Sequence, residues 1–227
     1  MVFAAASLTN ALEELGGQFM DETEVKVIFH FGGSNALARQ ILMDGPADLF
    51  ISAGAQPMDL VDQTGLLRED TRVDLLTNSL VLVGPANEPD KLKSLKELKS
   101  HGARMVIADP DLAPAGYYAR EALKALNLWD DLLPNLVFAT DVRTALSYVK
   151  MGNVDAGIVY RTDIMANEGF RIISSLPRAS YPTVLYAGGV TLSASPSIYA
   201  EKFLSFLTSR EAYQVYHKYG FEALPPQ

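Results

Sequence analysis

Hydrophobic residues in the first part of the chain follow two alternating patterns. Short, mainly apolar runs at residues 2–6, 25–31 and 48–52 predict buried strands. Apolar residues at helical spacing follow them and predict helices that begin near Leu8 and at Ser34. This alternation of strand and helix predicts an α/β protein with a parallel, doubly wound sheet.

The second half of the chain repeats the same plan. Its apolar runs predict strands at residues 79–84, 104–108, 135–139, 155–160 and 171–173. Pro114 suits the first turn of a helix, and Asp141 is a favourable N-cap for another. Two amphipathic helices, predicted at residues 196–208 and 209–218, close the chain.

Two segments are predicted to cross between domains. One crossing lies near residues 79–84, and the return lies within residues 182–192. The chain is therefore expected to form two lobes. Lobe 1 would comprise residues 1–80 and 184–227, and lobe 2 would comprise residues 81–183.

Ser7 and Ser34 both follow a predicted strand directly. At such a turn, free backbone N–H groups, a hydroxyl and the positive end of a helix dipole come together, which favours an anion. In a doubly wound sheet this is also the edge at which ligands bind. Taken one at a time, however, each serine is better explained as a helix cap.

Composition narrows the chemistry of the 227-residue chain. Its net charge of −8, with no basic stripe to offset it, argues against nucleic acid as a partner. An anion would have to be held by local dipoles, since the overall charge repels it. The absence of cysteine excludes a thiolate zinc site, and His30, His101 and His217 lack metal-ligand spacing. No apolar run approaches the ~20 residues of a membrane helix.

No catalytic motif stands out. A nucleophile elbow around Ser34 would need glycine at Ala36, and neither a dinucleotide fingerprint nor a Walker lysine is present. Arg39 and Arg143 lie close to the proposed binding turns. Each is interpreted as a solvated or lobe-bridging arginine, and a supporting role beside the anion is the alternative.

Several blocks of sequence together resemble the periplasmic molybdate-binding proteins of ABC transporters, the ModA family. The resemblance covers essentially the whole chain in order. Its blocks are Phe3-Ala-Ala-Ala-Ser-Leu-Thr-Asn10, Leu37-Ala-Arg-Gln-Ile41, Gly45-Pro-Ala-Asp-Leu-Phe-Ile-Ser52, Asn78-Ser-Leu-Val-Leu-Val83, Asp109-Pro110, Pro114-Ala-Gly116, Asp141-Val-Arg143, Gly157-Ile-Val-Tyr160 and Tyr219-Gly-Phe221.

The resemblance implies a two-lobed periplasmic-binding-protein fold of type II with two crossing segments and the ligand in the interlobe cleft. It implies hydroxyl donors and backbone N–H donors to the anion. The implied ligand-binding residues are Ser7, Ser34, Ala115, Val142 and Tyr160. Molybdenum would be held as its oxyanion, with no direct bond from these residues to the metal. Asn35 and Ala36 depart from many relatives, which have serine or threonine there.

The implied function is the binding component of a molybdate or tungstate importer, without catalysis and without a cofactor. The implied partner is an ABC permease at the inner membrane, and the protein would be a periplasmic monomer. The chain shows no signal peptide, which we expect to have been removed or truncated.

Physical chemistry supports such a ligand. Molybdate is a fully ionised dianion that accepts hydrogen bonds and donates none, so a site made only of donors suits it. Phosphate retains a proton, which would face a donor at a cost of ~1–3 kcal/mol.

Three alternatives stay open at this point. The first is a receptor for another oxyanion such as sulfate. The second is a phosphate-ester hydrolase that uses Ser34 as nucleophile, and the third is the effector-sensing module of a regulator. The hydrolase would need a general base near Ser34, and the local sequence contains none.

Overall fold

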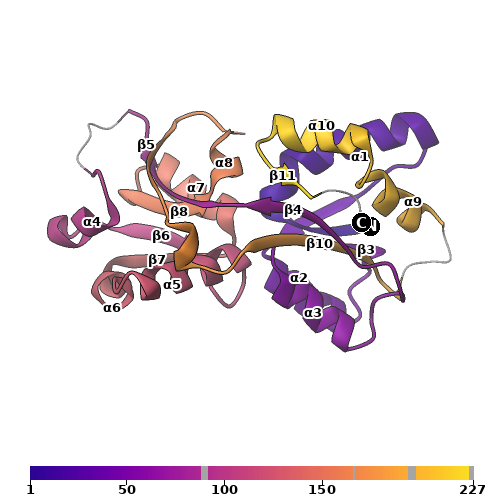
Figure 1. Cartoon of the computed structure of the whole chain (residues 1–227), viewed down its shortest axis with the longest axis horizontal. Helices are drawn as coiled ribbons and strands as arrows, with labels where there is room; N and C mark the ends of the chain where they lie inside the picture. Colours follow the sequence, from indigo (N-terminus) through magenta and orange to yellow (C-terminus); the bar gives the residue numbers. More distant parts are fainter. Residues whose placement is uncertain (88–91, 166, 194–197, 225–227) are drawn as a thin grey trace. The chain divides into compact units, whose positions relative to one another are not determined.

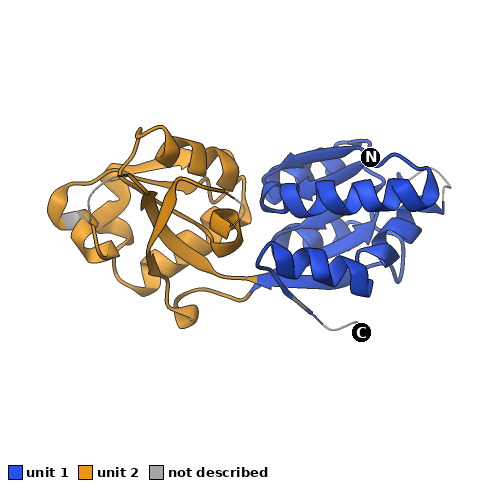
Figure 2. Ribbon diagram, turned by 90° about the horizontal axis from the view of Figure 1, so that it is seen from above, with its two compact units in different colours: residues 1–77, 184–227 blue, residues 78–183 orange. Residues whose placement is uncertain are grey.

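The computed structural model describes residues 1–87, 92–165, 167–193 and 198–224 (Figure 1). The chain forms two compact units, coloured separately in Figure 2. Unit 1 comprises Met1–Thr77 and Val184–Gln227, and unit 2 comprises Asn78–Thr183. Each unit contains its own mixed sheet covered by helices, so each is an α/β structure in its own right.

The sheet of unit 1 has the strand order β11-β4-β10-β3-β1-β2. Its strands are β1 (Val2–Ala5), β2 (Phe29–Gly32), β3 (Leu49–Ser52), β4 (Val73–Asn78), β10 (Val184–Val190) and β11 (Glu222–Ala223). β1 pairs in parallel with both β2 and β3, whereas β10 runs antiparallel to β3. The carboxyl ends of three neighbouring strands therefore meet at one edge.

Helices cover both faces of this sheet, with α1 and α10 on one side and α2 and α3 on the other (Figure 1). The helices of unit 1 are α1 (Thr9–Thr23), α2 (Ser34–Leu42), α3 (Ala55–Gln63), α9 (Tyr199–Phe206) and α10 (Arg210–Lys218). A buried cluster that includes Phe3, Ile41, Phe50 and Met58 lies between α2, α3 and the sheet. This core packs α2 and α3 against the sheet.

The sheet of unit 2 has the order β7-β6-β8-β5-β9. Its strands are β5 (Leu80–Pro85), β6 (Met105–Ala108), β7 (Leu136–Ala139), β8 (Ala156–Tyr160) and β9 (Phe170–Ser175). Its helices are α4 (Leu95–His101), α5 (Pro114–Ala125), α6 (Trp129–Leu132), α7 (Val142–Lys150) and α8 (Arg161–Met165). β6 pairs in parallel with β7 and β8, so this sheet also brings three carboxyl ends to one edge.

The purely parallel sheet predicted from the sequence is wrong. β5 is antiparallel to β8 and β9, β10 is antiparallel to β3, and β11 is antiparallel to β4. Strands β4, β5 and β10 lie in or next to the segments where the chain passes from one unit to the other, and apolar periodicity does not specify the direction in which such strands pair.

Other boundaries also differ from the sequence prediction. β4 was not predicted, because Asp74 and Thr77 interrupt its apolar pattern. β2 begins only at Phe29, although the pattern predicts a start at residue 25. Residues 88–91 of the expected loop and the start of the helix predicted at 196 lie outside the described residues.

The first helix tolerates two glycines in its interior. Gly16 and Gly17 lie within α1, which continues to Thr23. A Cβ atom on Gly16 would lie 2.7 Å from Cε2 of Phe29. Glycine is therefore needed at this point because α1 packs closely against β2.

Candidate functional site

Ser7 and Ser34 lie at the same edge of the unit 1 sheet. Ala5 at the end of β1 is paired with Gly32 at the end of β2. Each serine follows its paired residue by two positions, and both are buried. The parallel register thus brings together two turns that are 27 positions apart in the sequence.

A tyrosine from a distant strand holds the hydroxyl of Ser7. Oγ of Ser7 lies 2.9 Å from the hydroxyl of Tyr186, a fully buried residue of β10. Ser7 is part of a 3₁₀ turn (Ala6–Leu8), and the N-cap of α1 is Leu8, which makes no side-chain cap. The interpretation of Ser7 as the cap of this helix is therefore wrong.

The hydroxyl of Ser34 is held from β3. The main-chain N–H of Ala53 donates to Oγ of Ser34 at 3.0 Å. Ser34 is the first residue of α2, after Gly33 as N-cap, so it does not cap its own helix. Because a hydroxyl that accepts from an amide still carries its own proton, Ser34 can donate to a further acceptor.

Ala115 and Val142 occupy the first turns of two helices in unit 2. Ala115 is the second residue of α5, and Val142 is the first residue of α7. The first N–H groups of a helix have no acceptor within it, so these residues are suitable main-chain donors. β6 and β7, which precede the two helices, pair in parallel with Ala108 opposite Ala139.

Gly116 brings the start of α5 against the end of β6. A Cβ atom there would lie only 2.0 Å from the carbonyl oxygen of Ala108. Any larger residue would have to push α5 away from the strand. Glycine at this position is therefore required for the placement of the neighbouring Ala115 N–H.

The predicted N-cap Asp141 is confirmed. Its Oδ1 accepts from the N–H groups of Arg143 and Thr144 at 2.8 and 2.9 Å. These two bonds satisfy the second and third N–H groups of α7 and fix the direction of its first turn. The Val142 N–H is the remaining donor of that turn.

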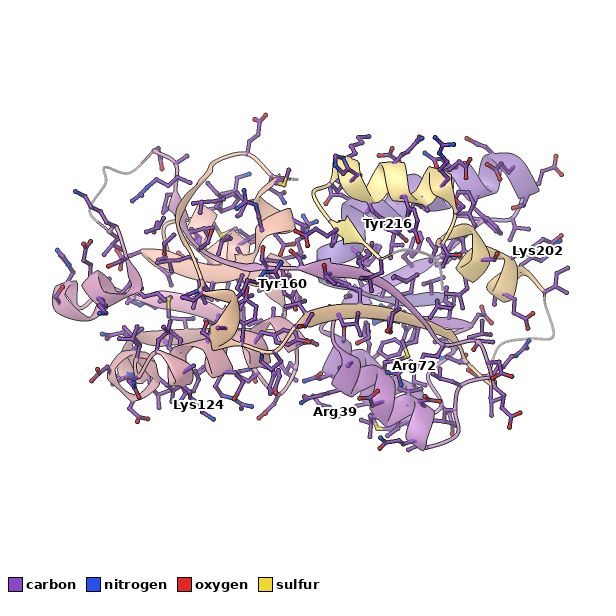
Figure 3. The ribbon with its side chains drawn as sticks, in the orientation of Figure 1. Arg39, Arg72, Lys124, Tyr160, Lys202 and Tyr216 are labelled. Carbon is purple, nitrogen blue, oxygen red and sulfur yellow. The ribbon has the colours of Figure 1, made fainter. Side chains whose placement is uncertain are left out.

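Tyr160 is the last residue of β8 and is buried (Figure 3). Its main-chain N–H donates to Oδ2 of Asp163 at 3.2 Å. Asp163 is the third residue of α8, and its carboxyl reaches back to the residue before the helix, as in one half of a capping box. Nε of Arg143 lies 3.6 Å from the other oxygen of the same carboxyl.

The side chain of Asp163 is completely buried, and this burial raises its pKa to about 7. The charge of Arg143 and the N–H of Tyr160 oppose the rise in pKa, and the nearby Asp141 adds to it. Burial dominates because the ionised carboxylate loses its hydration. Asp163 thus places a buried carboxyl with a raised pKa directly against the main chain of Tyr160, one of the predicted donors of unit 2.

Each unit brings its own predicted site residues to one sheet edge. These residues are Ser7 and Ser34 in unit 1 and Ala115, Val142 and Tyr160 in unit 2.

The sequence did not predict the supporting residues Tyr186, Ala53 and Asp163. Asp163 could have been found, because it stands three positions after Tyr160 at a helix start. Tyr186 and Ala53 gave no local signal, since strand pairing brings them to the serines.

The two arginines differ. Arg39 is exposed on α2 (Figure 3). Arg143 is half-buried and pairs with Asp163, so it is not a solvated surface arginine. Its contact with Asp163 ties it to the residues around Tyr160.

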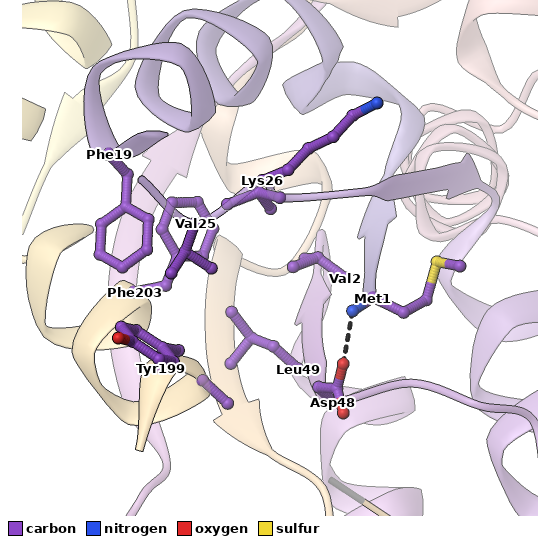
Figure 4. A pocket seen from close by; sticks show the side chains of 11 residues that line it. Met1, Val2, Phe19, Val25, Lys26, Asp48, Leu49, Tyr199 and Phe203 are labelled. Atoms are coloured by element: carbon purple, nitrogen blue, oxygen red, sulfur yellow. Dashed lines mark hydrogen bonds and ion pairs between the residues drawn. The ribbon is translucent and has the colours of Figure 1, made fainter. Parts of the chain in front are cut away.

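A separate pocket in unit 1 lies at the amino end of β1 (Figure 4). Its volume is about 190 Å³, and Phe19, Val25, Tyr199 and Phe203 form much of its wall. The α-amino group of Met1 pairs with the carboxylate of Asp48 at its rim. Neither predicted serine lines this pocket, and its apolar wall does not suit a dianion.

The described residues contain no group of three or more histidine, cysteine, aspartate or glutamate side chains that could hold a metal ion. None of their helices combines the length and the apolar character needed to cross a membrane.

The two α/β units match the fold of periplasmic solute-binding proteins. A family model described as bacterial extracellular solute-binding protein matches residues 1–222. The chain belongs to this family, which is a family of binding proteins and not of enzymes.

Several of its relatives are named as molybdate-binding proteins. The chain is 38% identical to the molybdate-binding protein ModA of Escherichia coli, over 97% of this chain and 87% of the relative. It is 34% identical to ModA of Haemophilus influenzae, over 98% and 89%. The structure of the periplasmic molybdate-binding protein of Azotobacter vinelandii matches with a TM-score of 0.87 and 26% identity, over 100% and 99% of the two chains. The predicted resemblance to this family is confirmed.

Proposed function

We propose that this protein is the molybdate- or tungstate-binding component of an ABC importer. The observation that carries the proposal is the pair of buried serines, Ser7 and Ser34, whose hydroxyls share one sheet edge and have only neutral hydrogen-bond partners. The molybdate-binding relatives, which match nearly the whole chain, support the same conclusion.

The proposed ligand set is Ser7, Ser34, Ala115, Val142 and Tyr160. Ser7, Ser34 and Tyr160 would donate through hydroxyls, and Ser7, Ser34, Ala115 and Val142 through main-chain N–H groups. One anion would take donors from both units, which requires the ligand to lie in the interlobe cleft. No cofactor takes part, and molybdenum is bound only through the oxygens of the anion.

Neutral donors are sufficient for tight binding of a dianion. A hydrogen bond to a charged group contributes about 1.5–3 kcal/mol, so several of them plus two helix N-termini offset the cost of dehydrating the anion. A proton on the ligand would face a donor in this site and weaken binding. Molybdate and tungstate are therefore preferred over hydrogen phosphate.

A calorimetric and thermal-unfolding panel with molybdate, tungstate, sulfate and phosphate tests the proposal. At a thousandfold excess over Kd, linkage stabilises the folded state by about 4 kcal/mol. For a chain of this size we expect a rise in Tm of roughly 8–16 °C. Phosphate is the matched control, and it should give neither heat nor a Tm shift.

A different ranking of ligands would overturn the proposal. Binding of phosphate or sulfate without binding of molybdate or tungstate would assign the site to another anion. Hydrolysis of a phosphate ester that disappears in Ser34→Ala would favour an enzyme, although the family gives no support for that alternative.

We also propose the cellular setting of this function. The protein would act as a monomer in the periplasm and deliver its anion to an ABC permease at the inner membrane. Membership of the extracellular solute-binding family supports the transport setting. Analytical ultracentrifugation with and without molybdate would test the monomer, with a dimer in both states as the contradicting result.

A further inference from the structure

Asp163 holds the main chain at Tyr160. Its carboxyl is fully buried, and Oδ2 accepts the Tyr160 N–H at 3.2 Å. The carbonyl oxygen of Asp163 accepts from Nδ2 of Asn167 at 2.7 Å, which fixes the short helix α8 in turn. The next residue back, Thr162, accepts from Nδ2 of Asn78 at 2.9 Å. The turn after β8 is thus fixed by side chains on both sides.

Arg143 connects this turn to a second one. Arg143 follows Val142 at the start of α7, and its own N–H is held by Asp141 at 2.8 Å. Its Nε lies 3.6 Å from Oδ1 of Asp163. The guanidinium therefore joins the first turn of α7 to the turn after β8, across two elements that pack against each other.

We propose that Arg143 and Asp163 are positioning residues for the anion-binding donors of unit 2. Their contact fixes the distance between the Val142 N–H and the end of β8, where Tyr160 lies. The inference rests on the proposed function, because it assumes that Val142 and Tyr160 contact the anion. It adds that two residues outside the proposed ligand set determine the affinity.

The buried charge makes this role more than a packing effect. A buried carboxylate is costly unless it is paired and hydrogen-bonded. Asp163 receives a main-chain N–H on one oxygen and faces a guanidinium with the other. Arg143 also offsets the negative charge that would otherwise repel an anion at the end of β8. Positioning and neutralisation thus come from the same contact.

Three variants of the full chain test the inference. Asp163→Ala removes both the hydrogen-bond acceptor and the negative charge. Asp163→Asn removes the charge but keeps an acceptor for the Tyr160 N–H. Arg143→Met keeps the length and the apolar stem of the side chain but removes the positive charge. Titration calorimetry with molybdate at pH 8 gives Kd. We expect Asp163→Ala and Arg143→Met to raise Kd by about tenfold, the effect of losing one hydrogen bond or charge contact. Asp163→Asn should recover most of the loss caused by Asp163→Ala.

Arg72→Met is the matched control. Arg72 pairs with Asp59 and Asp62 at 2.6 and 3.1 Å in unit 1, and none of these three residues is a proposed ligand. Its loss should leave Kd unchanged. Amide exchange of Tyr160 and Val142 in the ligand-free protein is the second readout, and it should accelerate in Asp163→Ala and not in Arg72→Met.

The outcomes separate this inference from the proposed function. If the wild-type protein does not bind molybdate, the proposed function fails first. If the wild type binds and Arg143→Met has the same Kd, the inference is overturned. It is also overturned if Asp163→Asn loses as much affinity as Asp163→Ala. Should Asp163→Ala fail to fold, Arg143→Met decides, because the Arg143 side chain is 24% exposed and the unpaired Asp163 carboxyl, whose pKa is already raised, can become neutral by taking up a proton.

Discussion

The two units present hydrogen-bond donors at a sheet edge in different ways. In unit 1 the donors are serine hydroxyls, and neutral groups hold them: the Tyr186 hydroxyl for Ser7 and the Ala53 N–H for Ser34. In unit 2 the predicted donors include two main-chain N–H groups, and a buried ion pair lies beside them. Both arrangements need a parallel strand pair.

The two units differ in whether charged side chains lie next to the proposed donors. Ser7 and Ser34 have no charged hydrogen-bond partner among the described residues. Unit 2 contains a buried carboxylate close to Tyr160, and it needs Arg143 to balance this charge. We therefore expect the stability of unit 2 to depend on pH through Asp163. The serine hydroxyls of unit 1 give no reason for such a dependence.

The largest expected effect is the pH dependence of stability through Asp163. Its pKa is raised to about 7, so the folded state binds its proton more tightly than the unfolded state between pH 4 and 7. The free energy of unfolding should fall by about 4 kcal/mol as pH rises through this window, and then stay level above it.

Asp163→Asn removes this titration and should flatten the curve. Urea unfolding of both proteins at each pH unit from 4 to 8 measures the difference between them. If the two curves run parallel, Asp163 does not titrate in this window, and the contrast between the units is lost.

Next in size is the loss caused by Gly116→Ala in unit 2. The new Cβ atom would meet the carbonyl oxygen of Ala108 at 2.0 Å, so α5 must move. We expect a destabilisation of about 3 kcal/mol and a weaker affinity for molybdate, since the Ala115 N–H moves with the helix. Thermal unfolding and titration calorimetry measure the two effects.

Gly17→Ala in α1 is the control for this change. A Cβ atom at Gly17 meets nothing within 4 Å, so alanine there should stabilise the helix by about 0.5–1 kcal/mol. Wild-type affinity in Gly116→Ala would remove the Ala115 N–H from the proposed ligand set.

A third prediction tests the hydroxyl donors of unit 1. Ser34→Ala should raise Kd for molybdate by roughly 10- to 100-fold, because one hydrogen bond to a charged ligand is lost. The buried Ala53 N–H also loses its acceptor, which costs about 1–3 kcal/mol of stability. Ser34→Ala should therefore also lower the free energy of unfolding, which replacement of an exposed serine would not do.

Ser209→Ala separates this role from helix capping. Ser209 is a true N-cap, whose Oγ accepts from the Ala212 N–H at 3.1 Å. Its loss should cost about 1 kcal/mol of stability without any change in Kd. Unchanged affinity in Ser34→Ala together with a loss of stability would reduce Ser34 to a structural residue.

The smallest expected effect concerns the support of Ser7. Tyr186→Phe removes the hydroxyl that lies 2.9 Å from Oγ of Ser7 but keeps the aromatic ring in the core. We expect Kd to rise by about three- to tenfold, the effect of one neutral hydrogen bond. Competition with a radioactive molybdate tracer has the precision for a change of this size.

Tyr216→Phe in α10 is the matched control. Its hydroxyl is buried and has no hydrogen-bond partner among the described residues, so its removal should leave Kd unchanged and should not lower stability. A larger change in Kd for Tyr216→Phe than for Tyr186→Phe would contradict the assigned support of Ser7.

Local patterns predicted much of the secondary structure. The strands before Ser7, Ala115 and Val142 and the cap at Asp141 could be predicted because each depends on residues within one turn or one strand. The antiparallel direction of β5 and β10 could not be predicted, because apolar periodicity contains no information on strand direction. β4 was missed for another reason, since its polar residues interrupt the apolar pattern.

The sequence by itself determined the family, the α/β class and the residue types available as donors at strand ends. These features follow from local order along the chain and from the resemblance of its blocks. Only the tertiary structure decided what holds each donor. Tyr186 reaches Ser7 from 179 positions away and Ala53 reaches Ser34 from 19 positions away, so both contacts depend on strand pairing. Burial, which raises the pKa of Asp163, likewise depends on the elements packed around it and not on its neighbours in sequence.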